Sequence, residues 1–212
     1  MIEQVDSAKQ SGNARRVLAD RPVVFWLDVA VKVALVGLLL FAALNQDIPR
    51  FHGKAMTGRA LTYPLSAVIV PLGWWLLSRR RRTPVAYPYT LDILLVLPFL
   101  IDTAGNAANL YDTVTWWDDF NHLLNWGILT AGFGQLLLRL PVGRLSLIGH
   151  CVGFGAVTAM LWEFAEYITF VRNSPELQTA YTDTLGDLAL GLAGSIIAAM
   201  LVGWLQWGRS NA

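Results

Sequence analysis

Three short clusters of acidic residues, one of which includes a histidine, have the residue types and spacing needed for chemistry. The clusters are Asp118-Asp119-x-x-His122, Glu163-x-x-Glu166 and Asp183-x-x-x-Asp187. Residues three or four positions apart share one face of a helix, so each cluster can present two polar side chains together. Helical bundles build carboxylate and histidine metal sites in this way. The clusters therefore predict a metal site or an acid–base site between helices.

Long apolar segments surround these clusters. The chain has 212 residues, 55% of them hydrophobic, and a mean hydropathy of +0.46, which is typical of an integral membrane protein. Six segments are long enough to cross a bilayer: about 23–44, 60–78, 90–108, 119–138, 145–170 and 183–207. We predict an all-α fold, a polytopic transmembrane helical bundle. The bundle covers 23–207, between a cytoplasmic N-terminal tail (1–22) and a short cytoplasmic C-terminal tail (208–212).

Basic residues predict the orientation. By the positive-inside rule, the richer side faces the cytoplasm. One side has eleven: Lys9, Arg15, Arg16, Arg21, Arg79, Arg80, Arg81, Arg82, Arg139, Arg144 and Arg209. The other has four: Arg50, Lys54, Arg59 and Arg172. Both termini are thus expected in the cytoplasm. The run of four arginines is explained by this topology, and we expect no nucleic-acid partner.

This orientation brings all three clusters to the outer end of the bundle. The fourth and sixth spans start there, and Glu163 and Glu166 come near the end of the fifth, which runs outward. An ionisable side chain within a membrane is costly, about 2.5–3.5 kcal/mol by insertion scales, and normally faces the bundle interior. Polar groups from separate helices are therefore expected to meet at one depth.

The charge balance at this end predicts bound cations or protons. Seven acids face Arg172 and His122 as the obvious bases: Asp102, Asp118, Asp119, Glu163, Glu166, Asp183 and Asp187. Packed carboxylates cannot all stay ionised in a low dielectric, and one or two divalent metal ions would balance them. The mixed oxygen and imidazole donors suit Mg²⁺, Mn²⁺, Zn²⁺ or iron.

These residues receive separate expected roles. The expected metal ligands are Asp119, His122, Glu163, Glu166 and Asp187, and the expected catalytic bases are Asp118 and Asp183. Asp118, Asp119 and Asp183 could instead cap helix starts, where negative charge is favourable. Glu163 and Glu166 have no such explanation, because they lie towards the end of a helix.

Two smaller patterns concern helix packing. Asp28 and Lys32, four residues apart in the first span, are expected to pair. Gly149-x-x-x-Gly153 and the series Gly186, Gly191 and Gly194 are expected to bring the fifth and sixth spans close together.

Several catalytic motifs are absent from the sequence. It has no His-Glu-x-x-His zinc motif, no Gly-x-Ser-x-Gly nucleophile elbow and no Walker loop. Its three histidines are too few for the iron ligands of a histidine-box desaturase.

The order of the clusters resembles that of the VanZ-like and YjdF-type inner-membrane proteins. Aspartates and His122 open one helix, Glu163 and Glu166 end the next, and Asp183-Thr-Leu-Gly-Asp187-x-x-x-Gly191 opens the last, within residues 87–200. Tyr111-Asp112 before the histidine helix favours the YjdF-type group. The resemblance implies a multi-pass protein of the bacterial inner membrane with a link to the cell envelope, and no established catalytic residue. Glu166 stands where VanZ-like chains often have glutamine, so the resemblance does not imply a role in antibiotic resistance for this chain.

Three functions fit these features. The leading hypothesis is an outer-leaflet site that holds a divalent ion and binds, hydrolyses or transfers the head group of a lipid or cell-envelope precursor. The second is a proton- or cation-coupled transporter, which requires polar residues towards the cytoplasmic side, where Asp92 is the evident one. The third is a binding or assembly module. Membrane lipids are the expected partners, and the sequence does not decide between an enzyme and its alternatives.

Overall fold

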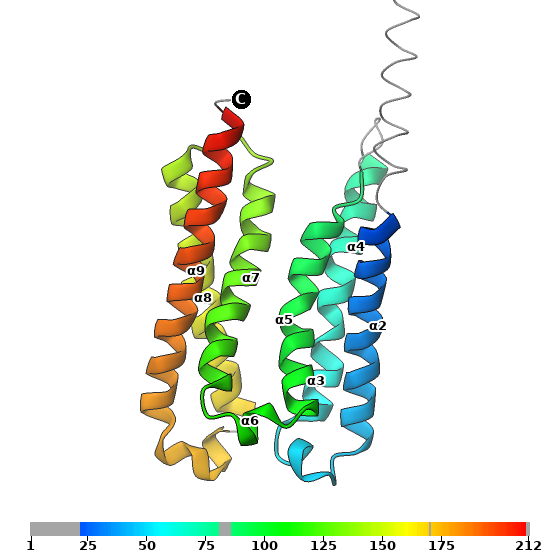
Figure 1. Cartoon of the computed structure of the whole chain (residues 1–212), viewed down its shortest axis with the longest axis vertical. Coiled ribbons are helices and arrows are strands. Elements are labelled where there is room, and N and C mark those ends of the chain that lie inside the picture. Colours follow the sequence, from blue (N-terminus) through cyan, green and yellow to red (C-terminus); the bar gives the residue numbers. More distant parts are fainter. Residues whose placement is uncertain (1–21, 81–85, 170, 211–212) are drawn as a thin grey trace, which may run out of the picture.

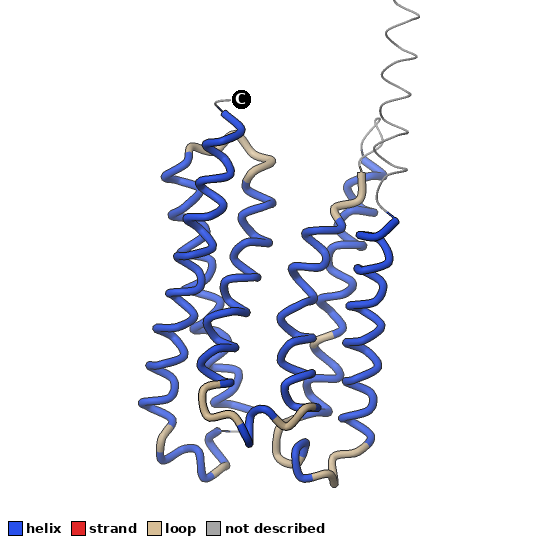
Figure 2. Tube along the Cα trace, viewed as in Figure 1, coloured by secondary structure: helices blue, strands red, loops and turns tan. Residues whose placement is uncertain are grey.

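The computed structural model describes residues 22–80, 86–169 and 171–210. Every regular element in these ranges is helical, which confirms the all-α prediction (Figure 2). Residues 1–21, most of the predicted N-terminal tail, lie outside the described residues, as do Arg81 and Arg82. The last helix continues to Ser210, within the predicted C-terminal tail of 208–212, and residues 211 and 212 are not described.

The long helices match the predicted spans to within a few residues. Their bounds are α2 (Pro22–Leu44), α4 (Pro64–Arg80), α5 (Tyr89–Ala107), α7 (Trp117–Leu137), α8 (Arg144–Thr169) and α9 (Ala180–Ser210). Two short helices, α3 (Met56–Thr62) and α6 (Leu110–Thr113), and 3-10 turns at Pro49–Phe51, Val171–Asn173 and Pro175–Gln178 connect them. The described start of α2 and the end of α9 lie at the same end of the bundle, as an even number of crossings requires (Figure 1).

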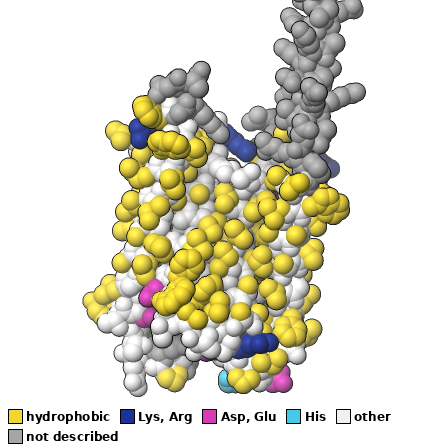
Figure 3. Space-filling model, in the orientation of Figure 1, with side chains coloured by type: hydrophobic (Ala, Val, Ile, Leu, Met, Phe, Trp, Pro, Cys, Tyr) yellow, Lys and Arg dark blue, Asp and Glu magenta, His cyan; other side chains and the backbone are white. Residues whose placement is uncertain are grey.

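Among the described residues, five helical segments are long and apolar enough to cross a membrane: α2, α3 with α4, α5, α8 and α9. The expected fourth span, α7, has 21 residues and runs between the same two ends, but it is less apolar. Its position explains this composition, because α7 contacts α5, α8 and α9 and so faces protein on several sides. Apolar side chains instead cover the outside of the bundle, as a lipid environment requires (Figure 3).

The helices form two groups, which we call the first group (α2–α5) and the second group (α7–α9), and α6 connects them at one end (Figure 1). Leu35, Leu39 and Val96 are buried in the core of the first group. Leu147, Cys151 and Ala199 are buried in that of the second. Helices α5 and α7 also contact each other, so the two groups meet along α5 and α7.

Helix α9 contacts α8, as predicted, but its glycines Gly191 and Gly194 approach α7 instead. A Cβ atom on Gly194 would lie 1.9 Å from the carbonyl oxygen of Leu123 in α7, and one on Gly191 would lie 2.6 Å from the Trp126 ring. Gly149 and Gly153 have open space where a Cβ would be, so this predicted motif does not mediate helix contact. The α8–α9 approach uses Gly155 instead, whose Cβ would lie 2.0 Å from the Ser195 hydroxyl oxygen.

Candidate functional site

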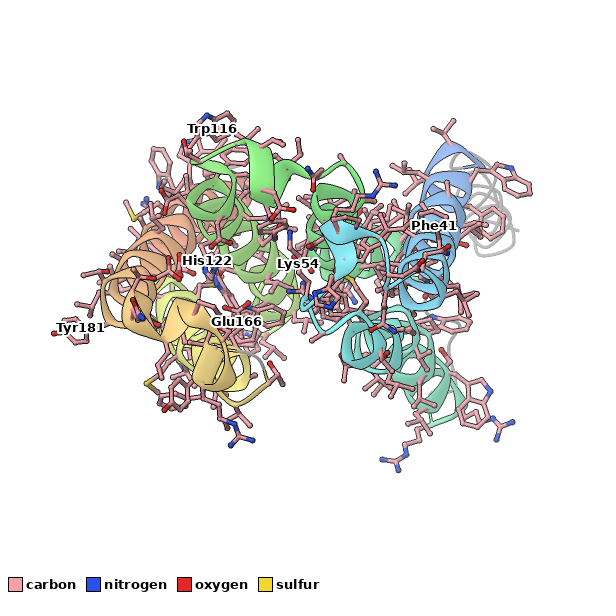
Figure 4. The ribbon with its side chains drawn as sticks, turned by 90° about the horizontal axis from the view of Figure 1, so that it is seen from below. Phe41, Lys54, Trp116, His122, Glu166 and Tyr181 are labelled. Atoms are coloured by element: carbon pink, nitrogen blue, oxygen red, sulfur yellow. The ribbon has the colours of Figure 1, made fainter. Side chains whose placement is uncertain are left out.

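A cavity of about 430 Å³ lies between the two helix groups, at the end where α5 ends and α7 begins. The second group contributes acidic and histidine side chains to its wall, and the first group contributes Lys54, Arg59 and Asp102. Seen along the helices, His122 and Glu166 lie on one side of the space between the groups and Lys54 on the other (Figure 4). Phe99 and Trp162 also line the cavity, so it offers apolar as well as polar surface.

His122 lies at the centre of the acidic side of this cavity. Its Nε2 atom is 3.8 Å from Asp118 Oδ1 and 3.7 Å from Asp187 Oδ1, and its Nδ1 atom is 3.7 Å from Glu163 Oε1. These distances exceed the usual hydrogen-bond length. The His122 ring is 8% exposed, and Nδ1 is buried with no hydrogen-bond partner among the described residues. A buried imidazole surrounded by carboxylates from α7, α8 and α9, yet bonded to none, is an unsatisfied polar group.

These residues form two overlapping sets of donor atoms. Asp118, His122 and Asp187 can each offer one atom so that all lie within 4.8 Å of one another, and His122, Glu163 and Glu166 form a second such set. We call the five residues the His122 cluster. In the part of the chain that the structure describes, no lysine or arginine forms an ion pair with its four carboxylates. The cluster is therefore suited to a cation.

The opposite wall is built around Asp102 of α5. Arg59 of α3 forms an ion pair with this carboxylate, and Tyr63 donates a hydrogen bond to Oδ2 at 2.7 Å. Tyr111 of α6 donates to Oδ1 at 2.7 Å. Since both oxygens are hydrogen-bonded and the charge is paired, Asp102 is balanced within the first group and α6.

Tyr111 links this wall to α7. Its hydroxyl accepts a hydrogen bond from Asn121, whose Oδ1 in turn accepts one from Asn125 at 2.8 Å. Burial, followed by the neighbouring Asp102 carboxylate, raises the pKa of Tyr111 above the ordinary tyrosine range. The hydroxyl thus stays protonated and can donate to Asp102 while it accepts from Asn121. This hydrogen-bonded chain connects the two helix groups beside the His122 cluster.

The structure brings most of the predicted site residues together. His122, Glu163 and Asp187 are buried, and Glu166 is half-buried in the cavity wall. Asp118, predicted as a base, lies beside His122, whereas Asp119, predicted as a ligand, is exposed and is not among the residues that line the cavity. The two aspartates differ because of the rotation of α7 about its axis, which turns position 118 and not 119 towards α9.

Asp183 and the basic residues complete the cavity. Asp183 is exposed but lines it one turn before Asp187, where a side chain can reach both solvent and a bound molecule. Lys54 forms an ion pair with Asp112 at 2.7 Å, at the exposed edge. From the sequence, the positive-inside rule alone accounts for Lys54 and Arg59, and no motif predicts a role for Asn121 or Asn125. An arginine directly before an apolar stretch and two asparagines inside another are the signal that indicates Arg59, Asn121 and Asn125.

A second ionic cluster lies at the opposite end of the first group. Lys32 pairs with Asp28 at 3.0 Å, as predicted, and also with Asp92 of α5. Tyr87, outside the long helices, donates to the same Asp92 carboxylate, and burial together with this hydrogen bond raises the pKa of Tyr87. Asp92 is fully buried. These ion pairs hold α2 against α5 at the end of the bundle away from the cavity.

Comparison with known proteins agrees with this picture of a helical bundle. Residues 27–208 match the profile of the family described as "Predicted membrane protein (DUF2238)". The chain belongs to this family. The match covers α4, α5, α7 and α8 in full and most of α2 and α9, so it includes both walls of the cavity. No curated protein and no solved structure matches the chain.

Proposed function

We propose that the cavity of this DUF2238 protein binds a divalent metal ion through the His122 cluster and acts on, or binds, the polar head group of a lipid or envelope precursor. The observation that carries the proposal is the buried, unbonded His122 ring with carboxylate oxygens of three helices 3.7–3.8 Å from its nitrogens. Two donors about 2.1 Å from one ion lie about 3.0–3.4 Å apart, so small side-chain rotations would close this arrangement around a cation.

The composition of the cavity supports a lipid as the bound molecule. Polar side chains gather in this cavity at one end of the bundle, and Phe99, Leu129 and Trp162 provide apolar surface beside them. A head group would lie at the His122 cluster while an apolar chain follows the aromatic side chains. The resemblance to VanZ-like and YjdF-type chains, together with the positive-inside count, favours the outer leaflet of a bacterial inner membrane and an envelope substrate.

The residues divide the chemistry between them. A divalent ion, when bound, supplies a Lewis acid and acidifies a bound water. Asp183, exposed beside the cluster, is positioned to accept a proton from that water. Lys54, which lines the opposite wall, is available to an anionic part of the substrate because its ion pair with Asp112 is exposed and weak.

Elemental analysis of the detergent-purified protein, prepared without chelators, tests the metal. We expect one or two divalent ions per chain, lost in a Glu163→Gln/Asp187→Asn double variant. Asp119→Asn is the matched control, since Asp119 is an exposed aspartate on α7, the helix that carries His122. Its metal content should equal that of the unchanged protein. An unchanged metal content in the double variant would refute the assignment of the His122 cluster.

The ionic cluster of Asp28, Lys32 and Asp92 favours a second candidate, coupled transport. It places buried ionisable groups at the end of the first group opposite the cavity, which a proton or cation path across the bundle requires. Flux in proteoliposomes under a pH or cation gradient, abolished by Asp92→Asn, would support this candidate. Absence of flux under both gradients would exclude it.

A further inference from the structure

The two edges of the His122 ring face different environments. The Nε2 edge faces Asp118 and Asp187, and the side chain of Asp118 is 48% exposed. The Nδ1 edge faces Glu163, whose side chain is only 6% exposed, and Nδ1 is itself buried. The side chain of Asp187 is only 5% exposed, so the Nε2 edge opens to the cavity on the side of Asp118. Glu163 also lines the cavity, but the Nδ1 atom beside it is closed off from the open space.

This difference matters because a neutral imidazole binds a metal through one nitrogen and carries a proton on the other. The protonated nitrogen of a metal-bound histidine almost always donates to a carboxylate, a carbonyl or water, which fixes the ring. A metal ion that acts on a substrate also keeps at least one coordination position open. The open Nε2 edge leaves room for an open coordination position, and Glu163 beside Nδ1 can accept the hydrogen bond that fixes the ring.

We propose that His122 binds the divalent ion through Nε2, together with Asp118 and Asp187, and that Glu163 is a positioning residue that accepts the Nδ1–H hydrogen bond. This inference rests on the proposed metal site and assigns its ligands. Closing the 3.7 Å separation between Nδ1 and Glu163 Oε1 to a hydrogen bond requires a movement of about 0.8 Å. The remaining coordination positions face the cavity, where Asp183 and a substrate head group can reach them.

The alternative arrangement places the ion at the Nδ1 edge, with Glu163 and Glu166 as ligands. It makes the opposite prediction for single variants. If Glu163 is a ligand, its replacement by glutamine removes one of three protein donors. If it is a hydrogen-bond acceptor, glutamine still offers an acceptor oxygen, and only the charge is lost.

Titration of the purified protein with Co²⁺, followed by its visible absorption, separates the two arrangements. We expect Asp118→Asn and Asp187→Asn to lose the Co²⁺ absorption band of the unchanged protein. Glu163→Gln should keep one Co²⁺ per chain with the same band shape and bind about 10- to 100-fold more weakly. Glu163→Asp, which restores the charge, should recover part of this affinity.

Asp118→Asn carries the test most safely, because an exposed side chain tolerates the change without loss of folding. Retained Co²⁺ affinity in Asp118→Asn, together with loss of the band in Glu163→Gln, would overturn the assignment and place the ion at the Nδ1 edge. The absence of stoichiometric Co²⁺ binding to the unchanged protein is a separate outcome, which would remove the proposed metal site itself.

Discussion

The close contact between α7 and α9 leads to a sharp prediction for Gly194. Replacing Gly194 by alanine would put a Cβ atom 1.9 Å from the Leu123 carbonyl oxygen and 3.2 Å from the Gly127 nitrogen. Both neighbours are backbone atoms, so no side-chain rotation can relieve the overlap. The two helices must separate by more than 1 Å to reach the shortest distance, 3.0 Å, that real Cβ atoms tolerate.

This separation has a cost that can be worked out from the contacts along the interface. A gap of 0.5–1 Å already removes about a quarter to a half of the dispersion attraction between facing atoms. It would also loosen the hydrogen bond from Thr130 to Ser195, 3.1 Å long. Overpacking of this kind costs about 3 kcal/mol, which lowers the unfolding temperature of a chain of this size by about 6–12 °C.

Thermal unfolding in detergent, followed by tryptophan fluorescence, measures the effect. Gly186→Ala is the control, because Gly186 lies on the same helix and has open space at its Cβ position. Its unfolding temperature should stay level or rise slightly, since alanine favours a helix over glycine. If Gly194→Ala unfolds within about 2 °C of this control, the close α7–α9 contact does not exist as described.

Three further predictions concern the Asp102 wall. Arg59→Met leaves the Asp102 carboxylate buried without its cation and should cost about 3–5 kcal/mol in chemical unfolding, whereas Lys54→Met breaks an exposed pair and should cost less than about 1 kcal/mol. Tyr111→Phe removes one donor to Asp102 and one acceptor for Asn121 and should cost about 1–3 kcal/mol in the same assay; a value near zero would mean that the chain of hydrogen bonds does not join the helix groups. Because the pKa of Tyr111 is raised on folding, its stabilising effect is complete below the ordinary tyrosine pKa near 10 and declines as the pH rises above it. Unfolding at pH 8–11 should therefore show a shallower decline in Tyr111→Phe than in the unchanged protein.

The sequence was sufficient to predict the helices and the depth of the polar groups. The spans follow from uninterrupted apolar runs, and the shared depth of His122, Glu163 and Asp187 follows from the direction of each span. Helix α7 shows that the hydropathy of a span depends on its position in the bundle. Helix α7 matches the expected fourth span, but it is less apolar than the five segments that could cross a membrane by composition alone. Its polar side chains are accommodated because α5, α8 and α9 surround it.

The choice between Asp118 and Asp119 could not be made from spacing. Position 118 is four residues from His122 and position 119 is three, and both spacings are compatible with one helix face. The rotation of α7 decides, and it is set by the contacts of Gly191 and Gly194 with Trp126 and Leu123. Such contacts join residues far apart in the sequence, so no local pattern reveals them.

The basic side of the cavity was missed for a related reason. Arg59 is followed by an apolar stretch, and the positive-inside rule accounts for a basic residue there without a partner. Its partner, Asp102, is 43 residues away on α5. Only the folded structure shows that this arginine pairs with a buried carboxylate of α5, which leaves the carboxylates of the His122 cluster without a lysine or arginine partner among the described residues.

The division of the bundle into two helix groups has a consequence for how the family can diversify. Every member of the His122 cluster comes from residues after 117, and Lys54, Arg59 and Asp102 all come before it. Substitutions before residue 117 can therefore reshape the wall opposite the cluster without changing any residue of the cluster itself. A chimaera that joins the first half of one relative to the second half of this chain should keep the residues of the proposed metal site and acquire the opposite wall of the other relative.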